Sequence, residues 1–72
     1  MEYIVVRLTG LPFYSADVLL DGEINGKTGE LLTLGNPGWV LISVNVSGAI
    51  EQSVEVKNTS PTRPMEIDIE SM

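Results

Sequence analysis

Residue types that most often carry out chemistry are scarce in this 72-residue chain, which contains no cysteine and no histidine. Catalysis by a serine or threonine hydroxyl needs a base that activates it. Lys27 and Lys57 could serve as bases only if they were desolvated, and both lie in polar turn sequences. Cysteine and histidine are also the usual zinc ligands. We therefore expect no enzyme activity, no cofactor and no metal site.

Carboxylates are the remaining reactive groups, and three of them follow a two-residue spacing near the end of the chain. Glu66, Asp68 and Glu70 would share one face of a strand. Paired carboxylates can perform general acid–base chemistry. Charged side chains on an exposed strand more often prevent sheets from pairing edge to edge. The alternative function is an acidic stripe that meets a basic partner.

A second acidic segment, residues 21–26, has oxygen-bearing side chains at alternating positions and a glycine at the sixth. This resembles the start of a calcium loop. An EF-hand needs a bidentate carboxylate at the twelfth position, and that position is Leu32, with Glu30 the nearest acid. The sequence therefore favours a turn, and it leaves open whether the segment from Asp21 to Glu30 binds a cation.

Apolar and aromatic residues in loop sequence are the candidate binding residues. Leu11, Phe13 and Tyr14 lie in a loop marked by glycine and proline, and Trp39 begins the most apolar segment. Exposed aromatic residues mark binding surfaces. In a small domain they can instead plug an open end of the fold. Because Trp39 precedes the inward-facing Val40, we expect it on the outer face or at the rim of its strand.

The element that organises the chain is the apolar segment 39–46, in which Val40, Ile42, Val44 and Val46 alternate with other residues. A period of two places these four side chains on one face of a strand. Similar alternation, separated by turn signals, recurs along the whole chain without a helical period. The expected strands are residues 3–8, 16–20, 30–34, 39–46, 51–56 and 65–69.

These elements predict one all-β domain spanning residues 1–72, a small antiparallel β-sandwich of about six or seven short strands. The Asp21-Gly22 and Asn25-Gly26 dipeptides are expected to form tight turns. Short connections favour hairpins between consecutive strands. The first and last strands are the candidate edges, and the first carries only Arg7 as an interior charge, so self-association through it is a hypothesis.

Charge narrows the range of partners. Ten acids against four bases give a net charge of −6, which argues against nucleic acid or an anionic membrane and suits a basic protein surface. No segment approaches the ~20 apolar residues of a membrane span. The N-terminal residues also lack the pattern of a secretory signal. We expect synthesis in the cytoplasm and leave the compartment open, with an envelope or virion assembly among the options.

Three segments resemble the PEGA domain, a small β-sandwich module. Residues 18–22 are similar to that family's apolar strand, which runs into an Asp-Gly turn. Residues 26–28 resemble its Gly-x-Thr motif, with Gly29 where the family usually has proline. Residues 37–48 resemble its Pro-Gly-x-x-x-Val-x-Val strand and the glycine that follows.

The name-giving Pro-Glu-Gly-Ala motif is not kept, because residues 14–16 occupy its place and only Ala16 matches. The resemblance covers residues 5–69. It implies a non-catalytic module, commonly attached to larger surface or envelope-associated proteins, and it implies no conserved active residues.

Together these observations predict a non-catalytic structural or protein-interaction module within a larger assembly. It would present the loop at residues 11–14, or an edge strand, to a protein partner or to a second copy. One alternative is a carbohydrate-binding module that uses Tyr14 and Trp39 as stacking platforms. Another is a virion or capsid decoration protein.

Overall fold

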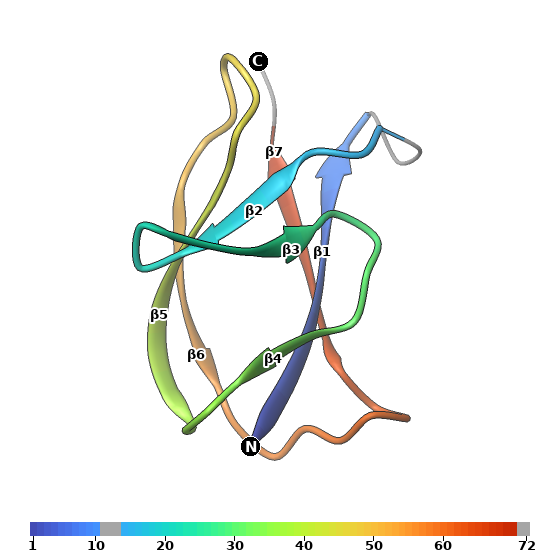
Figure 1. The fold of residues 1–72 in the computed structure, drawn as a ribbon, viewed down its shortest axis with the longest axis vertical. Helices are drawn as coiled ribbons and strands as arrows, with labels where there is room; N and C mark the ends of the chain where they lie inside the picture. Colours follow the sequence, from blue (N-terminus) through green and yellow to red (C-terminus); the bar gives the residue numbers. More distant parts are fainter. Residues whose placement is uncertain (11–13, 71–72) are drawn as a thin grey trace.

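The alternating segment around Ile42 forms strand β5 (Gly38–Val44). Val40, Ile42 and Val44 are buried on one face, and Trp39 is exposed on the other. The computed structural model describes residues 1–10 and 14–70 (Figure 1). Its other strands lie within two residues of their expected bounds, apart from one that was not expected. They are β1 (Glu2–Thr9), β2 (Asp17–Leu20), β3 (Glu23–Lys27), β4 (Leu32–Leu34), β6 (Gln52–Val56) and β7 (Met65–Glu70).

The strands form two sheets, one with the order β4-β1-β7 and the other with the order β3-β2-β5-β6. In Figure 1, β2 and β3 cross in front of β1 and β7. Both sheets contribute to one apolar core, so the predicted all-β sandwich is confirmed. The buried members of this core are Ile4, Val6, Leu8, Ala16, Val18, Leu20, Leu32, Val40, Ile42, Val44, Val54, Val56, Ile67 and Ile69.

The strand β3 was not predicted, because its sequence contains the Asn25-Gly26 turn signal. The Asp21-Gly22 dipeptide does form the turn, with φ values of 51° and 86°, as a two-residue hairpin of type I′ requires. Pairing of β3 with β2 then extends past Gly26 to Lys27, with a register shift between Asp17 and Leu19 of β2. Gly26 has a φ of 128°, and a Cβ atom there would lie only 2.5 Å from Cδ2 of Leu32. This glycine therefore permits close approach of β4 and does not reverse the chain.

The prediction that the first strand is an edge is wrong, because β1 is the middle strand of its sheet. It pairs with β4 through Glu2–Ile4 and with β7 through residues 4–9. The pairing with β7 is parallel, so this sheet is mixed and not purely antiparallel. Self-association through an open edge of β1 is therefore no longer supported, because both sides of β1 are paired. The last strand, β7, is an edge as predicted.

Pairing between consecutive strands is less general than expected. In the described part of the chain, only β2–β3 and β5–β6 pair as consecutive strands. The segment after β6 leads back to the start of β1, where Thr59 bonds to Glu2 and Tyr3. This return places β7 beside β1 in the parallel direction, and it leaves β6 and β7 as edges of different sheets.

Candidate interaction surface

The aromatic residues that the sequence singled out are exposed where the structure describes them. Trp39 is 71% exposed and Tyr14 is 54% exposed, so neither plugs an open end of the sandwich. Trp39 lies on the outer face of its sheet, as the alternation predicted. Leu11 and Phe13 lie outside the described residues, and their proposed binding role stays a prediction.

Tyr14 and Trp39 are not brought together. Val44 at the end of β5 pairs with Val18, near the start of β2 and only four residues after Tyr14. Trp39 is five residues away from Val44 at the other end of β5, which corresponds to roughly 17 Å of strand. The two rings therefore do not form a shared platform for a short glycan.

Trp39 instead belongs to a row of outward-facing apolar side chains that crosses three strands of the larger sheet. Leu19 of β2 pairs directly with Ile24 of β3 on one side and with Ser43 of β5 on the other. Leu41 and Trp39 follow Ser43 at two-residue intervals on the same face of β5. Direct cross-strand neighbours lie about 5 Å apart and diagonal ones about 7–8 Å apart. We call Ile24, Leu19, Leu41 and Trp39 the apolar stripe.

Most of the apolar stripe is in contact with solvent. Ile24 is 67% exposed and Leu41 is 39% exposed, while Leu19 is half-buried between its neighbours. These side chains face away from the core, since Val18, Leu20, Val40 and Ile42 fill the inner face of the same strands. A contiguous outward apolar row of this kind is typical of a surface that another molecule covers.

Ion pairs border both ends of the apolar stripe. At the β3 end, Nζ of Lys27 lies 2.9 Å from Oδ1 of Asp17. The hydrogen bond to Asp17, and then the charge of that carboxylate, raise the pKa of Lys27 above its ordinary value. At the other end, Glu55 is the direct neighbour of Trp39 and lies 3.6 Å from Lys57. Both lysines are thus paired with acids, so neither offsets the remaining negative charge of the chain.

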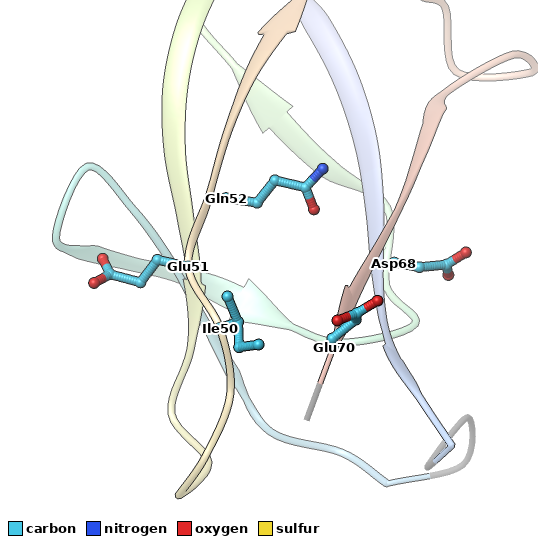
Figure 2. Close-up of a pocket in the computed structure, with 5 residues that line it drawn as sticks. All are labelled: Ile50, Glu51, Gln52, Asp68 and Glu70. Atoms are coloured by element: carbon cyan, nitrogen blue, oxygen red, sulfur yellow. The ribbon is translucent and has the colours of Figure 1, made fainter. Parts of the chain in front are cut away.

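A groove lies between the edges of β6 and β7 (Figure 2). It has a volume of about 320 Å³, and Gln52 extends from β6 toward β7 while Glu51 points away. The backbone N–H of Ile50 donates to the carbonyl of Glu70 at 2.9 Å, which ties the two edges at one end. The residues that line the groove are Ile50, Glu51, Gln52, Asp68 and Glu70.

The three carboxylates at two-residue spacing all lie on the exposed side of β7. Glu66 is held by Nη1 of Arg7 at 2.7 Å. Asp68 and Glu70 take part in no ion pair among the described residues. The row of three carboxylates that the sequence indicated is therefore present on β7. Among the described residues, Glu66 is paired with a cation and the other two are not.

Carboxylates of the segment that resembles a calcium loop are engaged with backbone groups. Oδ1 of Asp21 accepts a hydrogen bond from the N–H of Leu41 at 2.9 Å, and Oε1 of Glu30 accepts one from Lys27 at 3.0 Å. Across residues 1–10 and 14–70, no three potential metal-binding side chains of the His, Cys, Asp or Glu type cluster together. The segment therefore forms two turns, one on each side of β3.

Comparison of the chain with protein-family models and with curated proteins found no match. The resemblance to the PEGA domain therefore stays a prediction. The part of the chain that the structure describes contains no helix long and apolar enough to cross a membrane.

Sequence reasoning found Trp39 but missed its neighbours. Leu41 could have been identified from the same alternation, because it shares the outward positions of β5 with Trp39. Leu19 likewise alternates with the buried Val18 and Leu20. No alternation identified Ile24, because its strand, β3, contains the Asn25-Gly26 dipeptide, which predicted a turn.

Proposed function

We propose that this chain is a non-catalytic protein-interaction module and that the apolar stripe is its binding surface. The observation that supports this most is the exposure of Trp39 at 71% and Ile24 at 67% on the same face of one sheet. Covering a large apolar side chain contributes about 1.5–3 kcal/mol. A few such side chains carry most of the binding energy of an interface, and tryptophan is enriched among them.

Charge indicates the kind of partner. The chain has a net charge of −6, and both lysines near the apolar stripe are matched with acids. The partner surface that complements it is apolar at its centre and basic at its margin. A second copy of this chain would bring like charges together around the same stripe, so a different protein is the favoured partner.

The alternatives from the sequence receive less support. A glycan-binding platform built from Tyr14 and Trp39 is disfavoured by their separation along the sheet. Decoration of a virion or capsid remains a prediction about where such a module would work, and it is compatible with the proposed surface. Neither alternative has an observation of its own in the described residues.

Site-specific photo-cross-linking tests the proposal. A photoreactive amino acid is placed at Leu41, within the apolar stripe, or at Thr33, an exposed residue of β4 in the other sheet. In cells that produce the full chain, we expect one specific protein to be cross-linked from position 41 and not from position 33.

The cross-link should disappear when Trp39→Ser is introduced. The purified partner should then bind Trp39→Ser at least tenfold more weakly than the wild type, with Thr33→Ala unchanged. Equal capture from positions 41 and 33, or affinity unaffected by Trp39→Ser, would contradict the proposal.

A further inference from the structure

In the described part of the chain, the outer edge of β7 has backbone groups that no other strand pairs with. Within the described chain, β7 pairs with β1 on one side only. The carbonyl of Glu70 points away from β1, because it accepts the N–H of Ile50 across the groove. Backbone groups of a strand alternate in direction from one residue to the next. Glu66 and Asp68, at two-residue intervals, therefore direct their N–H and C=O groups toward the same open side.

Neither Glu66 nor Asp68 has a backbone partner on that side among the described residues. Unpaired strand edges attract additional strands. Of the other edges, β4 has only three residues, the register of β3 shifts where it pairs with β2, and β6 has five residues. The edge of β7 is therefore the longest of the four and borders a groove, and it is open up to Asp68, since the carbonyl of Glu70 is already bonded to Ile50.

We propose that this edge binds an extended peptide segment in which basic and apolar residues alternate, by addition of a strand to β7. This inference goes beyond the apolar stripe and depends on a different sheet. Residues of the added strand that share the outer face with Asp68 and Glu70 would meet two carboxylates that form no ion pair among the described residues. Arg7 is the direct neighbour of Asp68 on β1, but it is paired with Glu66. Lysine or arginine complements them at these positions.

The alternate residues of the added strand would face the other way. On that side Ile67 and Ile69 belong to the core, and the half-exposed Ile50 lines the groove. Branched apolar side chains such as valine suit these contacts. The groove volume of about 320 Å³ leaves room for them beside Gln52 (Figure 2).

The same charges exclude a second copy of this chain at the edge. Two β7 strands side by side would place Asp68 and Glu70 of one copy near those of the other. Like charges opposite each other destabilise a strand pair. The occupant is therefore a basic segment of another protein, which gains both main-chain hydrogen bonds and side-chain ion pairs.

A short synthetic peptide that alternates lysine and valine is the probe. It is titrated into isotope-labelled full-length protein while backbone amide signals and hydrogen exchange are followed by NMR. We expect saturable binding, with slowed exchange of the amides of Glu66 and Asp68. A peptide with glutamate in place of lysine should not bind. A lysine–valine peptide N-methylated on one edge should bind at least tenfold more weakly, because it cannot pair with the β7 backbone.

Matched variants separate this site from general attraction to an acidic protein. The double variant Asp68→Lys/Glu70→Lys should lose at least tenfold in affinity. The variant Glu23→Lys/Glu55→Lys changes the net charge equally on the other sheet and should retain binding within about twofold after correction for salt. Protection confined to β6, equal losses in both variants, or equal binding of the N-methylated peptide would overturn the proposal.

Discussion

Single side chains hold the loop before β7 against the first strand. Oε1 of Glu2 accepts hydrogen bonds from the hydroxyl of Thr59 at 2.6 Å and from its N–H at 2.9 Å. The N–H of Tyr3 donates to the same hydroxyl at 2.7 Å. These bonds, the hydroxyl first and the N–H second, lower the pKa of Glu2 below its ordinary value of 4.5.

This network makes a prediction about pH. A lower pKa in the folded state means that the Glu2 carboxylate contributes stability at neutral pH, and that the contribution is lost as the pH falls through the folded-state value. Glu2→Gln should lower the free energy of unfolding at neutral pH, and its difference from the wild type should shrink below pH 4.5. Urea denaturation of both proteins at neutral pH and at a pH below 4.5 measures this difference in the free energy of unfolding. Glu51→Gln is the control, and an equal effect of both substitutions would contradict the assignment.

Thr28 is the buried polar residue that closes the start of β2. Its hydroxyl accepts a hydrogen bond from the N–H of Ala16 at 3.1 Å and donates one to the carbonyl of Tyr14 at 2.8 Å. Thr28→Val keeps the shape and leaves these backbone groups unsatisfied, so we expect a loss of about 1–3 kcal/mol. Thr33→Val on the exposed face of β4 should change stability by less than about 0.5 kcal/mol. Chemical denaturation of both variants distinguishes them.

At the level of elements, two glycines of the β2–β3 hairpin have different functions. Gly22 has a φ of 86° in the turn, and a Cβ atom there would meet nothing within 4 Å. Gly26 combines a φ of 128° with a close approach to Leu32. The first glycine is thus required by the backbone alone, whereas the second also lets the edges of the two sheets come together.

Substitutions at these glycines should therefore differ in cost. Gly22→Ala should lower stability by about 1–2 kcal/mol, the cost of a left-handed conformation. Gly26→Ala should cost more, because the added methyl group also displaces Leu32. In a double-mutant cycle with Leu32→Ala, the Gly26→Ala penalty should fall, whereas that of Gly22→Ala should not. Thermal unfolding of the set gives the coupling, and strict additivity at position 26 would refute the steric explanation.

Considered as a whole molecule, the chain separates its stabilising residues from its exposed apolar residues. The inner face of the larger sheet contains Ile42, which is fully buried. The outer face of the same strands presents the apolar stripe. A domain of this size typically has only about 3–5 kcal/mol of stability, and side chains that stay mostly in water contribute little of it.

Stability and binding should therefore respond to different substitutions. Trp39→Ser/Ile24→Thr should leave the free energy of unfolding within about 1 kcal/mol of the wild type, because both side chains are mostly in water. Ile42→Ala should cost about 2–5 kcal/mol and unfold much of the population. Circular dichroism during urea denaturation checks both. A loss from the double variant as large as that from Ile42→Ala would show that the apolar stripe is a structural element.

The sequence alone determined the local geometry of this protein, because a two-residue period assigns each side chain to a sheet face whatever the strand pairs with. It thereby predicted the all-β class, the buried Ile42 and the outward Trp39, together with the turn at Asp21-Gly22. Its net charge also indicated a basic partner surface.

Only the tertiary structure decided which strands are neighbours. The central place of β1 and its parallel pairing with β7 depend on how the segment after β6 returns to Glu2, which involves residues far apart in the chain. The open β7 edge follows from that pairing, and the apolar stripe follows from the pairing of β2 with β3 and with β5. Alternation fixes the face on which a side chain lies, but the identity of its neighbour across the sheet is a long-range property that the burial of the whole core selects.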